Sequence, residues 1–145
     1  MDSAQSRRED VYVKGQRVAT LNAVFRFIAK EHDDTVLVDG ICKLLVEYRP
    51  YPYVWIGRAV DDGSVTPVAS AGNIPDFLVN IAVRWDDTPT GRGTVGPAIR
   101  MQTLCIASTS DPRLSPWRDR FERHGIGSAI SLPFHFVDGS HGVLV

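Results

Sequence analysis

The segment GRGTVGPAIR, residues 91–100, carries the side chains best suited to ligand binding in this chain. Its glycines leave backbone N–H groups accessible, and Arg92 and Arg100 add positive charge. The segment leads into a short predicted helix with Pro97 in its first turn, and the N-terminus of a helix favours an anion. No Gly-Lys-Ser or Gly-Lys-Thr follows, so this is not a P-loop. In the binding interpretation we expect Arg92, Thr94 and Arg100 to contact the ligand; in the alternative, the glycines serve only to let the chain turn.

The second set of candidates comprises the three tryptophans, Trp55, Trp85 and Trp117. An indole ring can form the floor of a pocket and stack on a planar ligand, although more often it fills a core. In the strand predicted over residues 53–60, Trp55 lies on one face while Val54 and Ile56 lie on the other. Either face is open as the side of the pocket. We expect Trp55 and Trp85 to contact the ligand.

The cysteines and histidines are too dispersed for a redox or metal site. Cys42 and Cys105 show no CxxC spacing, and Cys105, in the middle of TLCIA, is interpreted as a small buried apolar side chain. The histidines form no HExxH motif. His135 and His141 lie on the two arms of the last predicted hairpin, but the Asp138-Gly139 turn is not expected to place them directly opposite each other. We therefore predict no metal site.

No catalytic arrangement is visible either. The adjacent pair Asp86-Asp87 is followed by Thr-Pro-Thr, which is typical of a turn or a helix cap. No serine lies in a Gly-x-Ser-x-Gly context. Because no nucleophile stands next to a base, the sequence predicts no catalytic residue, and we expect that the chain is not an enzyme.

Composition excludes several classes of partner. The chain has 145 residues, of which 43% are hydrophobic and 23% charged, values that are ordinary for one soluble globular domain. Its net charge of −1 offers no basic field for nucleic acid or an anionic membrane. No apolar run is long enough for a membrane helix, and the N-terminus does not have the pattern of a signal peptide. We expect a cytoplasmic location, with no nucleic acid partner and no membrane contact.

Hydrophobic periodicity and turn signals predict the order of elements. Residues 1–17 are interpreted as a polar tail or linker, and residues 18–145 as a single domain. Asp34 is the candidate N-cap of the second helix, and Pro67 is expected at a sheet edge or bulge. Ser115 is the expected N-cap of a helix that Gly125 ends. The predicted helices cover residues 18–30, 34–48, 74–85, about 97–101 and 116–124, and the predicted strands cover 53–60, 65–71, 103–107 (buried), 128–137 and 141–145.

This order predicts an α+β fold, with a central antiparallel sheet of five or six strands and helices on both faces. The order and its local words resemble a GAF domain. The short segments that carry the resemblance follow one another over residues 18–145. They are LNAVFRFIA, LVDGICKLLVE, YVWIGRA, VTPVASAG, GRGTVGPAIR, SPWRDRFERHGIGSAISLPF and HGVLV. The resemblance is closest to GAF domains between PAS domains and GGDEF, EAL or histidine-kinase output domains in bacterial signalling proteins.

The resemblance implies two helices and a C-terminal helix on one face of the sheet, and a ligand pocket under the middle helices and loops on the other. The C-terminal helix is expected to be lacking here. No motif of chromophore-binding or cyclic-nucleotide-binding GAF domains is recognisable, so ligand and cofactor stay unassigned. The leading hypothesis is a sensory domain that binds a small molecule between the sheet and residues 77–101, in a parent protein that forms a homodimer. The alternative is a ligand-free module for dimerisation and signal relay.

Overall fold

The computed structural model describes residues 3–30, 33–48 and 51–145, with the backbone alone for residues 18 and 20–30. The chain folds into helices and strands joined by turns and two short 3-10 helices. In chain order they are α1 (Ser3–Lys30), α2 (Asp34–Tyr48), β1 (Tyr53–Ala59), β2 (Val65–Gly72), a 3-10 turn (Pro89–Gly91), α3 (Val95–Met101), β3 (Cys105–Ser108), a 3-10 helix (Pro112–Trp117), α4 (Arg118–Arg123), β4 (Ser128–His135) and β5 (His141–Leu144).

The five strands form one antiparallel sheet in the order β2-β1-β5-β4-β3. This confirms the predicted α+β class. The pairing of β1 with β2 shifts between Ile56 and Gly57, where Val68 has no partner, so a bulge lies at this point. Pro67 stands beside the bulge on the edge strand β2, as predicted, because proline has no N–H to donate to a ladder.

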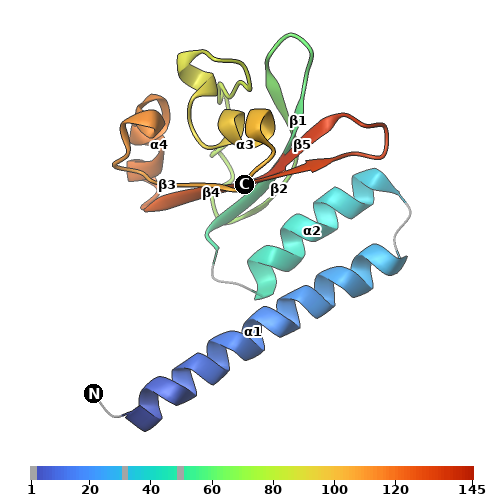
Figure 1. The fold of residues 1–145 in the computed structure, drawn as a ribbon, viewed down its shortest axis with the longest axis vertical. Coiled ribbons are helices and arrows are strands. Elements are labelled where there is room, and N and C mark those ends of the chain that lie inside the picture. The colour runs from blue at the N-terminus through green and yellow to red at the C-terminus, as the bar shows by residue number, and fades with distance from the viewer. Residues whose placement is uncertain (1–2, 31–32, 49–50) are drawn as a thin grey trace.

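Helices cover both faces of the sheet (Figure 1). α2 packs on β1 and β2, and α3 packs on the opposite face against β3, β4 and β5. Because side chains alternate along a strand, β1 contributes to two cores. The α2-side core contains Val38, Cys42, Val54, Ile56 and Phe136. The α3-side core contains Trp55, Val65, Ile74, Phe77, Val83, Val95, Ile99, Ala107, Leu114, Trp117, Phe121 and Val143.

The N-terminal region differs from the sequence prediction. The segment interpreted as a polar tail, residues 1–17, is helical from Ser3 onward, and α1 continues without a break to Lys30. α1 packs along α2 on the side away from the sheet, so it forms an outer layer (Figure 1). α2 is capped by Asp33 and not by Asp34, because the Asp33 carboxylate accepts from the backbone N–H groups of Thr35 and Val36.

The helix predicted over residues 74–85 is wrong. Residues 75–80 form successive turns, and Asn80 adopts a left-handed conformation with φ 54° that no regular helix contains. The carbonyl groups of Phe77 and Val79 accept hydrogen bonds from the Arg120 guanidinium. The apolar residues Phe77, Leu78, Ile81 and Trp85 have the spacing of a helix face. In the structure they pack into or against the α3-side core from turns and extended chain.

The last helix also starts differently. A 3-10 helix over Pro112–Trp117 precedes α4, and its N-cap is Asp111 instead of Ser115, since the Asp111 carboxylate accepts from the Arg113 N–H at 2.9 Å. Gly125 ends the helix as predicted. Its φ is 67°, its N–H donates to the Glu122 carbonyl, and the next N–H, of Ile126, donates to the Phe121 carbonyl.

Two predictions about the C-terminal strands are wrong. β3 is an edge strand and not a buried one: Ile106 is 58% exposed, and Cys105 is half-buried. His135 and His141 do pair directly across β4 and β5, with ring centroids 4.7 Å apart. The pairing continues through the turn, because the Phe136 N–H donates to the Ser140 carbonyl and keeps the two arms in register.

Candidate functional site

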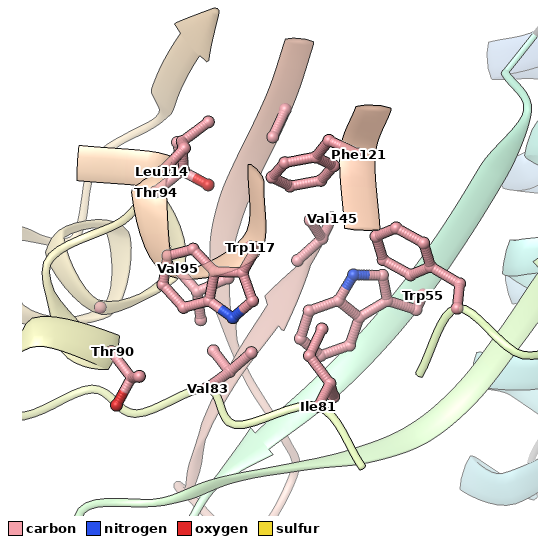
Figure 2. Close-up of a pocket in the computed structure, with 13 residues that line it drawn as sticks. Trp55, Ile81, Val83, Thr90, Thr94, Val95, Leu114, Trp117, Phe121 and Val145 are labelled. Carbon is pink, nitrogen blue, oxygen red and sulfur yellow. The ribbon is translucent and has the colours of Figure 1, made fainter. Parts of the chain in front are cut away.

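A small cavity lies within the α3-side core (Figure 2). Its volume is about 50 Å³. The sheet forms one wall, the segment from Phe77 to Gly96 forms a second, and the 3-10 helix with α4 forms a third. The lining side chains are mostly aromatic or aliphatic. They are Trp55, Phe77, Ile81, Val83, Thr90, Thr94, Val95, Gly96, Leu114, Trp117, Phe121, Ala129 and Val145.

Strand alternation places Trp55 in this cavity. Residues Trp55 and Gly57 point to the α3 side, and Ile56 between them points to α2. At Gly57 a side chain would meet the Trp55 ring at 2.8 Å, so glycine leaves room for the indole. Trp55 is 3% exposed. This cavity lies on the Trp55 face of the strand, while Ile56 lines a second and larger pocket, of about 360 Å³, on the α2 face.

Thr94 and Ser131 supply a polar spot in an apolar wall. The Ser131 hydroxyl donates to the Thr94 hydroxyl oxygen at 2.8 Å, and both side chains are buried. Thr94 directly precedes α3, and Ser131 lies on β4, so the bond joins helix to sheet. The Thr94 hydroxyl proton makes no further hydrogen bond among the described residues, which leaves it free to be donated toward the cavity it lines.

The glycine-rich loop is held by its own arginines. The Arg100 guanidinium donates to the carbonyls of Trp85, Asp86 and Gly91 at 2.8–2.9 Å. Arg92 donates to the Asp87 carboxylate at 2.8 Å. Both positive charges therefore hold the loop together, and neither points into the cavity.

The glycines of this loop have a steric role. A methyl group at Gly91 would overlap the Asp86 carbonyl, and one at Gly96 would overlap the Gly91 carbonyl. The sequence left open whether the loop binds an anion or contains glycine because the chain turns. The geometry favours the second interpretation.

Of the five residues expected to contact a ligand, two line the cavity. Trp55 and Thr94 come together there, whereas Arg92 and Arg100 belong to the loop scaffold. Trp85 lies outside the cavity, with its indole N–H donating to the Val60 carbonyl at 2.7 Å and its ring beside His141.

Sequence reasoning missed most of the apolar wall. Ile81 and Val83 alternate into the cavity, a strand-like period that the helix prediction over residues 74–85 obscured. Trp117 and Phe121 line it from one side at i, i+4 spacing, which is a readable helical signal. Trp117 and Phe121 lie near Trp55 only because of tertiary packing between segments about sixty residues apart in the chain. No local sequence pattern predicts such a contact.

Asp86 fixes the entry to the loop. Its carboxylate accepts from the Arg84 guanidinium, with 2.8 Å to Nη2, and from the Thr88 hydroxyl at 2.7 Å. Mainly the Arg84 hydrogen bonds, and then that of Thr88, lower the pKa of Asp86 from 3.8 to about 2. The Arg84 guanidinium also donates to the Asp62 carbonyl and so ties the loop to the β1–β2 turn.

The low pKa of Asp86 predicts a pH dependence. Because the folded-state pKa is depressed, its stabilisation is fully present above about pH 4 and is lost as pH falls toward 2. We expect Asp86→Asn to lower the urea midpoint at pH 5–7, and the gap to wild type to narrow between pH 4 and pH 2. Urea titrations followed by circular dichroism check this. A gap that is constant down to pH 2 would contradict it.

The described part of the chain contains no group of three or more His, Cys, Asp or Glu side chains that could hold a metal ion. Among the same residues, no helix has the length and apolar character to cross a membrane.

The GAF domain model matches residues 34–145, which is most of the chain.

The chain belongs to the GAF domain family.

Solved GAF domains share its fold. The NLH2 GAF domain of A. aeolicus in an inactive state aligns with TM-score 0.67 at 12% identity, over 90% of this chain and 78% of that one. The GAF domain region of a putative membrane protein from Geobacter sulfurreducens gives 0.58 at 15%, over 86% and 76%. Free methionine-R-sulfoxide reductase from Neisseria meningitidis, in complex with its substrate, gives 0.62 at 16%, over 89% and 70%. No curated protein matches the sequence.

The reductases correct one prediction. We expected that the chain is not an enzyme, but the GAF fold also supports catalysis, as in the Neisseria meningitidis enzyme. The Staphylococcus aureus reductase, in complex with its substrate, repeats the likeness with TM-score 0.59 at 15% identity, over 89% of this chain and 76% of that one. The missing catalytic motifs are therefore no ground for excluding enzymatic activity from this GAF domain.

The two thiols of this GAF domain should differ in reactivity. Cys42 is fully buried in the α2-side core, and burial, with a smaller contribution from Asp39, raises the pKa of its thiol to about 12. Cys105 is half-buried on the edge strand. Because the thiolate is the reactive form, we expect Ellman's reagent at pH 8 to modify Cys105 alone in the native protein and both thiols in guanidinium chloride. Equal rates for the two native thiols would contradict this assignment.

Proposed function

We propose that this GAF domain is the sensory domain of a bacterial signalling protein and binds a small molecule in the cavity between its sheet and residues 77–96. The observation that carries the proposal is the space among four large aromatic rings, with a hydroxyl pair at its edge. A packed core fills such space with side chains. The substrate complex of the similarly folded Neisseria meningitidis protein supports a small molecule as the occupant.

The walls of the cavity suggest how binding would be transmitted. The turns of residues 75–80 carry Phe77 into the cavity, and they are held to α4 by Arg120. A ligand that contacts Phe77 and Trp55 favours the arrangements of these turns that fit it, and so shifts their population. The coupling strength equals the difference in affinity between the arrangements.

A cavity-filling variant tests the proposal. Ala129 lines the cavity from β4, and valine at this position adds two methyl groups in a residue type that strands favour. A panel of small metabolites, charged and neutral, is screened for an increase in melting temperature. We expect at least one compound to stabilise the wild type and not Ala129→Val.

Ser128→Val, at the exposed neighbouring position on β4, is the matched control and should keep the response. The proposal fails if no compound stabilises the wild type, or if every compound that does so stabilises Ala129→Val equally.

The second candidate, a module for dimerisation and signal relay, is favoured by the outer face of α1. Val11 and Tyr12 are 70% and 67% exposed on a helix that extends past the end of α2 (Figure 1). Contiguous exposed apolar residues mark sites of interaction with another protein surface. Light scattering after gel filtration tests it: we expect a dimer for the wild type and a monomer for Tyr12→Glu, while ligand response is kept if the two functions coexist.

A further inference from the structure

We propose that the cavity selects a small uncharged molecule that carries a hydrogen-bond acceptor on an otherwise apolar body, and that the indole N–H of Trp55 recognises the acceptor. This rests on the proposed function, since it assigns a ligand class to the same cavity. Three features point to this class: the size of the cavity, the charge of its lining, and the indole of Trp55, which has no side-chain hydrogen bond among the described residues.

The lining contains no charged side chain. All thirteen lining residues are apolar, aromatic, glycine or threonine. The nearby arginines, Arg92 and Arg100, are already bonded to the loop. An ion moved from water into such a site loses its hydration without gaining an opposite charge, which is strongly unfavourable. This disfavours carboxylates, phosphates and ammonium groups as the buried part of the ligand.

The three indole N–H groups differ in their partners. Trp85 donates to the Val60 carbonyl at 2.7 Å, and Trp117 donates to the Ala82 carbonyl at 2.9 Å. Trp55, although 3% exposed, makes no side-chain hydrogen bond within the described part of the chain. Among these residues, every side-chain nitrogen or oxygen that is fully buried has a hydrogen-bond partner. The Trp55 nitrogen has no such partner, so it is not fully buried and borders open space.

We assign the open space beside the Trp55 nitrogen to the cavity that this residue lines. Trp55 lines it, and Figure 2 shows the nitrogen turned toward Phe121 and Val145, two other lining residues. An acceptor on a ligand that enters this space gives the Trp55 N–H a hydrogen-bond partner, which the described residues do not supply. The Thr94 hydroxyl, held by Ser131, offers a second donor at another part of the lining. The indole N–H can only donate, so the ligand group beside it must accept.

Size restricts the ligand further. An apolar cavity of about 150 Å³ in another protein holds benzene. At about 50 Å³, this cavity suits a molecule of only a few non-hydrogen atoms. Even at the best efficiency seen for tiny ligands, four such atoms give a Kd of about 10⁻⁵ to 10⁻⁴ M. Binding must therefore be measured at millimolar ligand.

Four probes of equal size and similar branched shape separate the ligand classes. Acetone is uncharged with an acceptor, isobutane is uncharged without one, acetate is an anion, and trimethylammonium is a cation. Each is titrated into ¹⁵N-labelled protein, and the three indole N–H signals are followed by NMR. Trp55→Phe, which deletes its own signal, assigns the spectrum. The signals of Trp85 and Trp117 are internal controls, because both protons are already bonded.

We expect acetone to move the Trp55 signal downfield in a saturable way, and acetate and trimethylammonium to bind at least about tenfold more weakly. Isobutane should leave the Trp55 proton without a hydrogen-bond shift. Deleting the N–H in Trp55→Phe should weaken acetone binding about tenfold, measured on the methyl signal of Val145. Trp85→Phe is the matched control and should bind acetone like the wild type.

The outcomes separate this inference from the function on which it rests. Tighter binding of acetate or trimethylammonium at the Trp55 signal overturns the ligand class and leaves a small-molecule cavity in place. If no probe moves this signal while a metabolite still stabilises the wild type and not Ala129→Val, the class fails and the function stands. If neither assay detects binding, both fail.

Discussion

Replacing Trp117 by alanine is expected to lower the free energy of unfolding of this GAF domain by about 3–5 kcal/mol. The Trp117 ring is buried in the α3-side core and lines the cavity. It contacts the loop closely enough that a methyl group on Gly93 would come within 2.5 Å of it. The substitution removes this packing and leaves the Ala82 carbonyl without its donor. Urea denaturation followed by circular dichroism measures the loss.

Two further variants test whether the loss is due to the Trp117 ring itself. Trp117→Phe keeps a ring and should lose less, about half as much, which keeps the test informative if the alanine variant does not fold. Trp85→Ala removes a half-buried tryptophan outside the cavity and should be milder than Trp117→Ala. Added indole should restore part of the melting temperature of Trp117→Ala by occupying the vacated space. A loss under about 1 kcal/mol in Trp117→Ala would show that the ring is not an anchor of the core.

Gly91→Ala is expected to destabilise the protein by about 3 kcal/mol, although it adds one methyl group. That methyl would overlap the Asp86 carbonyl, and backbone cannot move aside as a flexible side chain can. A shift of Gly91 also displaces the carbonyl that accepts from Arg100 at 2.8 Å, and Arg100 joins Trp85, Asp86 and the loop. The expected result is a lower melting temperature and urea midpoint.

Gly127→Ala is the matched control. Nothing lies within 4 Å of a methyl group at that position, so we expect a change within about 0.5 kcal/mol. If Gly91→Ala behaved like Gly127→Ala, the loop would be deformable, and the proposed scaffold role of its glycines would be wrong.

Local patterns predicted those parts of the fold that local forces decide. Alternation along residues 53–60 separated the Trp55 face from the Ile56 face, and Gly125 ended α4 by its left-handed conformation. The edge position of Pro67 followed from its missing N–H. Each of these depends on one residue and its immediate neighbours, so the sequence carries the information directly.

The remaining elements depend on contacts between distant residues. Residues 74–85 have a helical apolar spacing, but Arg120, from a later helix, binds the Phe77 and Val79 carbonyls and stabilises turns instead. Arg92 and Arg100 looked available for an anion because their partners, Asp87 and the loop carbonyls, become neighbours only when the loop folds back. In the cavity, Trp55 and Thr94 were identified by type, whereas Phe121 was recognisable only after α4 had been placed.

The two cores on β1 have a mechanical consequence. Trp55 belongs to one core and Ile56 to the other, so the cavity and α2 are linked by strand backbone and not by interlocking side chains. We therefore expect a ligand that displaces the indole to shift β1 as a unit. The bulge beside Gly57, whose extra residue Val68 lies on β2, is a point at which the pairing of β1 with β2 is already interrupted. A substitution that makes the bulge more rigid should weaken the coupling between the cavity and α2. It should leave the affinity of the cavity for its ligand unchanged.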